Sequence, residues 1–172
     1  MRSPRLASAT SVISLALSLG AAGHAWAQSS VLSPSHDEAS VTTHATGTFD
    51  VTLTPQTTVH SATNLGRMSI EKHFHGDLEG TSRGEMLTAM TDVPGSAGYV
   101  AIEQVSGTLH GRRGTFVLQH SGVVAHGTQQ LRITVVPDSG TDDLAGLAGT
   151  MTITITDGKH AYDFEYTIGT SD

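Results

Sequence analysis

Apolar and polar residues alternate with a period of two along most of the chain from Gly47 onward, and no segment keeps a helical period. Short clusters of Gly, Pro, Asp and Ser separate the alternating segments, as is typical of turns. The segments predicted to be strands are 47–54, 66–74, 84–91, 98–109, 114–124, 128–136, 149–156 and 160–168. About eight short strands predict an all-β fold, a single antiparallel barrel that is closed or nearly closed, because closure removes exposed strand edges.

The last predicted hairpin has the clearest register. Asp157-Gly158 is a dipeptide that favours a two-residue turn. Counting back from this turn pairs Ile155 with His160, Ile153 with Tyr162, Met151 with Phe164, and Gly149 with Tyr166. These residues share an apolar and aromatic face, which we expect to face the core.

A second predicted hairpin, residues 99–120, reads YVAIEQVSGTLHGRRGTFVLQH and carries two ionisable side chains among its apolar positions. A turn at Arg112-Arg113 would pair Leu109 with Phe116, Gly107 with Leu118, and Val105 with His120, and would place Glu103 opposite Gly122. Burial of the apolar members then carries Glu103, His120 and Tyr99 into the barrel. Glu103 and His120 become diagonal neighbours, about 7–8 Å apart at the backbone.

Glu103 and His120 are therefore the candidate catalytic residues. A buried carboxylate loses hydration, and an imidazole beside it can exchange a proton with it, which suits general acid–base chemistry in an isomerisation or cyclisation. The candidate ligand-binding residues are Tyr99, Phe116, His160, Tyr162 and Tyr166. A structural interpretation stands beside this one, because buried polar pairs often satisfy each other, and Lys72, Arg112 or Arg113 can also neutralise Glu103.

His73 and His75 have a spacing that two metal ligands can use. Strand alternation, however, places them with Ser69 and Glu71 on the face opposite Met68, and the sequence offers no third ligand. We therefore expect exposed histidines, no metal and no cofactor. The Gly-rich segments lead into no helix, and the chain has neither a Gly-x-Ser-x-Gly motif nor a Cys nucleophile.

The first 27 residues predict a secretory signal peptide, with Arg2 and Arg5 at its start, VISLALSL over 12–19, and cleavage after Ala27. The eight apolar residues are too few to span a bilayer. The predicted organisation is a signal peptide over 1–27, a flexible leader over 28–46, the barrel over 47–168 and a C-terminal tail over 169–172. We expect the mature protein to be periplasmic or secreted, and the absence of Cys means that it folds without disulfides.

The charge of the chain argues against two classes of partner. Loss of Arg2 and Arg5 leaves seven basic residues against sixteen acidic ones, a formal net charge of −9. An acidic chain with no basic run is a poor candidate for binding nucleic acid or an anionic membrane surface. We expect neither partner.

Four blocks in this order carry a resemblance to a known family: GDLEGTSRGEML, GYVAIEQVSGTLHGRRGTFVLQHSG, VVPDSGTDDLAGLAGTM and HAYDFEYTI. Over about 47–168 the chain resembles a bacterial domain-of-unknown-function family of small allene-oxide-cyclase-like β-barrels. The resemblance implies a barrel whose family pattern includes Tyr99 and Glu103, Phe116 to His120, and His160 to Tyr166. Asp142 departs from this pattern, in which Gly is preferred, and the family has no established catalytic residues to transfer.

These observations favour an exported small barrel that binds a small, largely apolar molecule in its lumen. One alternative is an isomerase- or cyclase-like enzyme that uses Glu103 and His120. The other is a structural module with a packed barrel, whose outer residues Val100, Ile102 and Val117 form a homo-oligomer contact. An open cavity lined by Glu103 and His120 favours binding, whereas a filled lumen beside an exposed apolar stripe favours assembly.

Overall fold

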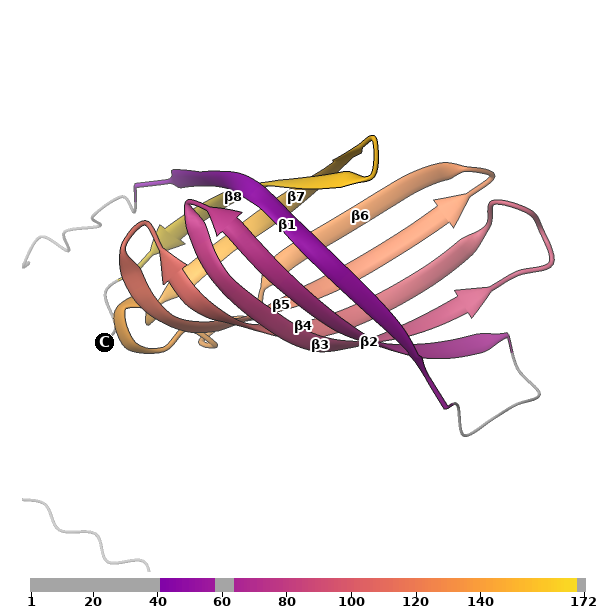
Figure 1. Ribbon diagram of the computed structural model, residues 1–172, viewed down its shortest axis with the longest axis horizontal. Helices are drawn as coiled ribbons and strands as arrows, with labels where there is room; N and C mark the ends of the chain where they lie inside the picture. The colour runs from indigo at the N-terminus through magenta and orange to yellow at the C-terminus, as the bar shows by residue number, and fades with distance from the viewer. Residues whose placement is uncertain (1–40, 58–63, 170–172) are drawn as a thin grey trace, which may run out of the picture. The chain divides into compact units, whose positions relative to one another are not determined.

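The computed structural model describes residues 41–57 and 64–169, which form a closed antiparallel β-barrel (Figure 1). Its strands are β1 Thr43–Gln56, β2 Leu65–Gly76, β3 Leu78–Met90, β4 Ala97–Leu109, β5 Arg112–Ala125, β6 Thr128–Val135, β7 Leu147–Thr156 and β8 Lys159–Ile168. Each strand pairs with the next along the chain, and β8 pairs with β1 to close the barrel. The predicted fold class is confirmed.

Two strands begin four or more residues earlier than the alternation predicts. β1 begins at Thr43, inside the segment predicted as a leader, where Ala45 is completely buried. β3 begins at Leu78, six residues before the predicted start at 84. Gly80, which contributes to the turn-like composition there, lies within the strand at a place where a Cβ would lie 2.4 Å from the carbonyl oxygen of Ser106. The predicted signal peptide lies outside the described residues, as do most of the predicted leader and tail.

The register predicted for the last hairpin is confirmed. Ile155 pairs with His160, and the remaining pairs follow in order to Gly149 with Tyr166. Asp157 and Gly158 have φ values of 51° and 76°, as a two-residue turn of the hairpin type requires.

The predicted turn of the β4–β5 hairpin is wrong. The turn is His110-Gly111, with φ values of 46° and 81°, and Arg112 already pairs with Leu109 inside the ladder. Glycine adopts a positive φ at little cost, which favours this turn over one with two arginines.

The observed β4–β5 pairs are Leu109 with Arg112, Val105 with Phe116, Glu103 with Leu118, Ala101 with His120 and Tyr99 with Gly122. Each β4 residue therefore pairs with a β5 residue that lies four positions earlier in the sequence than the predicted partner. An even shift leaves every side chain on its predicted face, so Glu103, His120 and Tyr99 still point inward.

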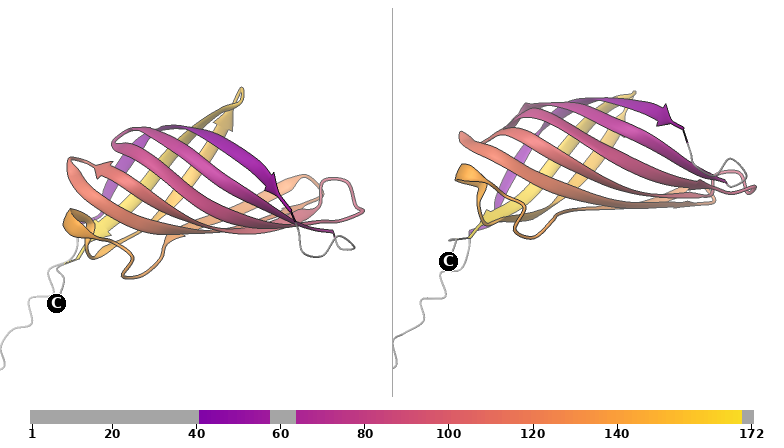
Figure 2. Two further views of the ribbon diagram at one scale, coloured as in Figure 1. Left: turned by 60° about the horizontal axis from the view of Figure 1, so that its bottom comes forward. Right: turned by 90° about the horizontal axis from the view of Figure 1, so that it is seen from below.

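One half of the barrel is filled by side chains. A short 3₁₀ helix, η1 (Asp142–Leu144), covers this end, and Leu144 is completely buried there (Figure 2). The Phe116 and Phe164 rings stack in this half with 5.7 Å between centroids. Each large side chain buried in this way contributes about 1.5–3 kcal/mol relative to exposure. We call this part the closed half.

The opposite half is less tightly joined. β6 and β7 share only two registered pairs, Ile133 with Met151 and Thr134 with Thr150. Beyond them the two strands diverge toward the β5–β6 and β7–β8 turns, as the ribbon shows (Figure 1). Side chains of both diverging segments line a cavity, so we call this part the open half. No helix among the described residues is long and apolar enough to cross a membrane.

Candidate functional site

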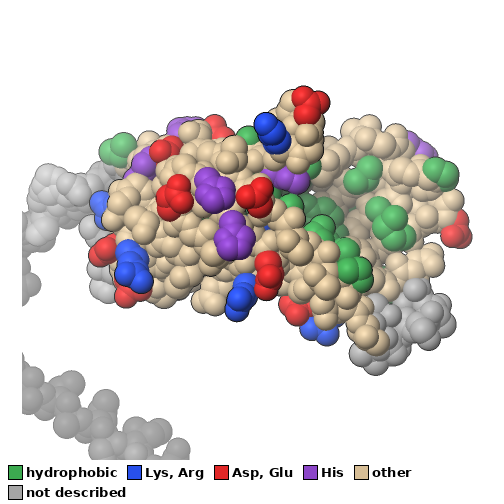
Figure 3. All heavy atoms as spheres, viewed as in Figure 1, with side chains coloured by type: hydrophobic (Ala, Val, Ile, Leu, Met, Phe, Trp, Pro, Cys, Tyr) green, Lys and Arg blue, Asp and Glu red, His purple; other side chains and the backbone are tan. Residues whose placement is uncertain are grey.

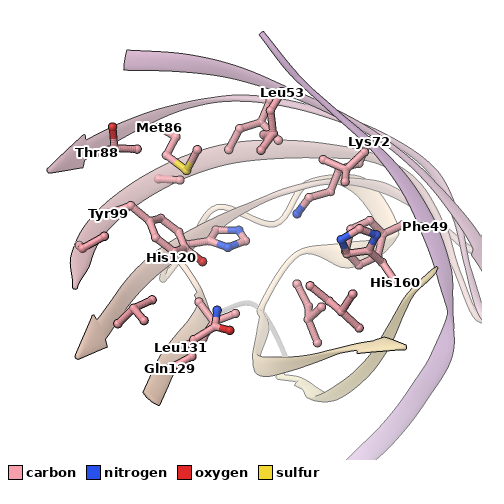
Figure 4. A pocket seen from close by; sticks show the side chains of 18 of the residues that line it. Phe49, Leu53, Lys72, Met86, Thr88, Tyr99, His120, Gln129, Leu131 and His160 are labelled. Carbon is pink, nitrogen blue, oxygen red and sulfur yellow. The ribbon is translucent and has the colours of Figure 1, made fainter. Parts of the chain in front are cut away.

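A cavity of about 340 Å³ occupies the open half, and all eight strands contribute side chains to it (Figure 4). Its wall is mostly apolar and includes Val51, Ile70, Met86, Ala101, Leu131 and Ile153. Strand alternation places these side chains inward, and the divergence of β6 from β7 leaves space between them. The volume lies at the lower end of the range usual for small-molecule sites, about 300–1,000 Å³.

Three side chains form a polar cluster at the floor of the cavity, and we call Lys72, Glu103 and His120 the floor cluster. The Lys72 amino group donates a hydrogen bond of 2.8 Å to Oε1 of Glu103. Nε2 of His120 lies 3.4 Å from the same oxygen, within ion-pair range but without hydrogen-bond geometry. All three residues are buried, and Glu103 is completely so.

The charges of the floor cluster keep Glu103 ionised. Burial alone would raise the pKa of the Glu103 carboxyl, because a charge is costly away from water. His120 and the Lys72 ammonium together outweigh this effect and hold the pKa of Glu103 below its ordinary value. The cluster is therefore a buried ion pair with an imidazole beside it.

Aromatic rings complete the surroundings of the lysine. The Lys72 amino group lies 4.9 Å from the centroid of the Phe49 ring and 5.7 Å from that of Phe74. The negative faces of such rings attract a cation. Figure 4 shows the amino group pointing into the cavity between His120 and His160. Oε2 of Glu103 makes no hydrogen bond with any described residue.

Tyr99 forms the part of the wall next to His120. Its ring lies over Gly122, its partner on β5, and a Cβ on that glycine would lie 2.2 Å from Cε1 of the ring. Glycine at position 122 is therefore what lets the ring lie flat against the strand. Burial, together with the nearby Glu103 charge, raises the pKa of the Tyr99 hydroxyl, which stays protonated at neutral pH.

The structure brings only some of the predicted site residues together. Tyr99, His120 and His160 line the cavity, and the His160 ring packs 5.0 Å from that of Phe49. Glu103 lies directly behind the wall and has no exposed surface in it.

The other three predicted ligand-binding residues lie in the closed half. Phe116 stacks on Phe164. The Tyr162 hydroxyl accepts a hydrogen bond of 2.9 Å from the backbone N–H of Leu78. The Tyr166 hydroxyl lies 2.8 Å from Nδ1 of His110. These contacts give the three residues structural roles at a distance from the cavity.

Lys72 is the site residue that the sequence interpretation placed least well. The sequence predicted it only as one of three cations able to neutralise Glu103. Its position was nevertheless readable, because strand alternation places it on the same face as Ile70 and Phe74, both of which are buried.

His73 and His75 are exposed on the outer face of β2, as predicted. His75 lies 3.5 Å from Asp50, and no group of three or more potential ligands able to hold a metal occurs within residues 41–57 and 64–169.

The outer surface near the open half is also apolar. Val100 and Ile102 are 53% and 50% exposed, whereas Val117 is half-buried. Leu65, Leu87 and Val123 join Val100 around a shallow groove on this face. Hydrophobic side chains gather in the right half of the space-filling view, around a hollow (Figure 3). An open cavity and an exposed apolar stripe are thus both present.

The comparisons with known proteins agree with this architecture. A family model described as "Protein of unknown function (DUF3224)" matches residues 45–166. The chain is also similar to a crystal structure of a protein with unknown function from the DUF3224 family of Shewanella oneidensis MR-1. The two are 51% identical, the match covers 76% of this chain and 100% of that one, and the TM-score is 0.73. No curated protein matches the chain.

Proposed function

The chain belongs to the DUF3224 family of proteins of unknown function, and we propose that it binds a small, largely apolar molecule in the open half of its barrel. The observation that carries this proposal is the cavity of about 340 Å³, with an apolar wall and a few polar groups at its floor. This combination is typical of small-molecule sites, in which apolar contacts provide affinity and a few polar groups fix the orientation. The likeness to allene oxide cyclases stays a prediction.

Large apolar side chains at the cavity rim support the same function. Leu53 and Ile155 line the cavity and are 46% and 59% exposed. Exposed apolar side chains around a concave site are characteristic of binding surfaces. A bound apolar molecule would cover them and remove their unfavourable contact with water.

We do not extend the proposal to acid–base catalysis by Glu103 and His120. A general base needs to reach the proton that it removes, and Glu103 has no exposed surface in the cavity. Its Oε1 also accepts the Lys72 hydrogen bond. In this proposal Glu103 positions Lys72, and binding without chemistry is the function.

We also propose that the mature chain is exported, and the support for export is the N-terminal sequence alone. Arg2 and Arg5, the apolar run over 12–19 and the AWA site ending at Ala27 are its support. A cell-fractionation experiment with the full-length chain tests it, since export predicts a shortened periplasmic or extracellular form.

Titration with N-phenyl-1-naphthylamine, a neutral dye that fluoresces more strongly in apolar surroundings, tests binding. Leu131, half-buried on β6, lines the cavity, whereas Val100 lies on the outer face of β4. Leu131→Trp would fill the cavity and weaken dye affinity at least about tenfold, equivalent to ~1.4 kcal/mol. The matched control Val100→Trp would leave the affinity unchanged.

A reversed pattern would locate the dye on the outer groove, and it would support the alternative of an interaction module. No fluorescence change with the unmodified protein would overturn the proposed function.

A further inference from the structure

The polar groups that reach the cavity floor are mainly hydrogen-bond donors. An ammonium group has three N–H donors and no acceptor. Lys72 uses one of them on Glu103, the single residue among those described to which it hydrogen-bonds. The Tyr99 hydroxyl makes no hydrogen bond with another described residue, and burial keeps it protonated. A ligand oxygen at this floor would therefore meet unused donors from β2 and β4.

The floor cluster already holds one positive and one negative charge in contact. Lys72 and Glu103 are 2.8 Å apart, and their side chains are 6% and 0% exposed. A ligand carboxylate would bring a second negative charge into the same water-poor space, beside the Glu103 carboxylate. A neutral oxygen acceptor accepts the same hydrogen bonds without that cost.

We infer that the ligand is a neutral apolar compound with one carbonyl-type oxygen, which binds deep in the cavity between the Lys72 amino group and the Tyr99 hydroxyl. This inference rests on the proposed function and names the ligand class for the same site. The hydrocarbon part lies toward the mouth, between Leu53 and Ile155.

The arrangement of the floor supports this orientation. Lys72, Tyr99 and His120 come from β2, β4 and β5 and point toward one space (Figure 4). Phe49 closes the space beneath the ammonium, and Ala101, paired with His120, leaves room between the polar groups. Lys72 and His120 thus bring polar atoms to the deep end, and the rest of the wall is mostly apolar, with Thr88, Gln129 and His160 as its other polar side chains.

Three probes of one ring size test the inference: acetophenone with a carbonyl, ethylbenzene without one, and benzoate with a charge. Their affinities would be measured by ligand-observed NMR on the unmodified protein and on Tyr99→Phe. This substitution removes the hydroxyl and keeps the ring that covers Gly122. Tyr99→Phe would weaken acetophenone about two- to tenfold, the range of one net hydrogen bond, and leave ethylbenzene unchanged. Benzoate would bind the unmodified protein at least about tenfold more weakly than acetophenone.

A second variant tests the lysine. The pair Lys72→Met with Glu103→Leu removes both charges together, so no unpaired buried charge remains to unfold the barrel. It would weaken acetophenone and leave ethylbenzene binding intact.

Each outcome decides between the two proposals. Equal effects of Tyr99→Phe on acetophenone and ethylbenzene would overturn the inference while leaving the proposed function standing. Tighter binding of benzoate than of acetophenone would do the same. Failure of every probe to bind would overturn the proposed function and, with it, this inference.

Discussion

Lys72 on β2 and Glu103 on β4 meet inside the barrel across the intervening strand β3, with 2.8 Å between Nζ and Oε1. Neither side chain has more than 6% of its surface exposed. The contact joins two strands that are not neighbours in the sheet, and it lies at the boundary between the filled half and the cavity. Lys72 therefore forms part of the floor of the binding site, and Glu103 holds it in place from behind the wall.

Removing one member of this pair would destabilise the protein strongly. Glu103→Gln leaves the Lys72 charge buried without its counter-charge, and such losses cost about 3–5 kcal/mol. Chemical denaturation at pH 7 measures the free energy of unfolding. In the control, Lys72→Met with Glu103→Leu, both charges are gone, so we expect stability close to or above that of the unmodified chain. A double variant as unstable as Glu103→Gln would show that the pair matters for its shape and not for its charge.

The same pair makes stability depend on pH. The pKa of the Glu103 carboxyl is lower in the folded protein than in the unfolded chain. The stabilisation by the Glu103 charge is therefore fully present above the unfolded-state pKa of about 4.3. It is lost as the pH falls through the lower folded-state pKa. The difference in unfolding free energy between the unmodified protein and Glu103→Gln should shrink below about pH 4. Denaturation series between pH 7 and pH 2.5 measure it. A difference that grows on acidification would contradict the assignment.

Gly122 is predicted to be intolerant of a side chain. In Gly122→Ala the new Cβ would lie 2.2 Å from the Tyr99 ring, so the ring must move at a cost of about 1–3 kcal/mol. Gly98→Ala, on the neighbouring strand, is the matched control, because its Cβ meets nothing closer than 3.8 Å. Thermal unfolding compares the two. The explanation fails if Gly98→Ala is the more damaging variant.

A substitution at Gly111 tests the observed β4–β5 turn. Its φ of 81° disfavours any other residue, and a Cβ there would have open space around it. Gly111→Ala should therefore cost about 1–2 kcal/mol from backbone conformation alone. Arg112→Ala and Arg113→Ala, at exposed ladder positions, should change stability by less than about 0.5 kcal/mol. Larger losses at the arginines would favour the turn first predicted from the sequence.

Much of the fold was predictable because alternation is a local property of each strand. Asp157-Gly158 specified its hairpin correctly. The dipeptide favours a two-residue turn, and a turn at this place also puts the apolar residues of both strands on one face. The β4–β5 turn was harder to predict, because Gly111 and Gly114 flank the two arginines. The sequence is therefore compatible with a turn at His110-Gly111 and with one at Arg112-Arg113. Those turns differ by an even shift, so the faces of Glu103, His120 and Tyr99 were correct despite the wrong pairing.

The position of the cavity was not predictable in the same way. Alternation shows that a side chain points inward, but it does not show which half of the barrel is filled. Here Leu144 of η1 and the stacked pair Phe116 and Phe164 fill one half. Such packing depends on contacts between segments far apart in sequence, so Phe116, Tyr162 and Tyr166 were assigned to the ligand although they lie in the filled half.

Methyl NMR during titration with ethylbenzene tests the central claim most directly, because it locates the bound molecule. Binding inside the barrel predicts saturable shifts of the Met86, Ala101 and Ile153 methyl signals, which come from side chains that line the cavity. The methyl signals of Leu65, Leu87 and Val123, on the outer groove, should stay in place. Shifts confined to the outer methyls, or no saturable shift at the inner ones, would contradict a ligand-binding lumen.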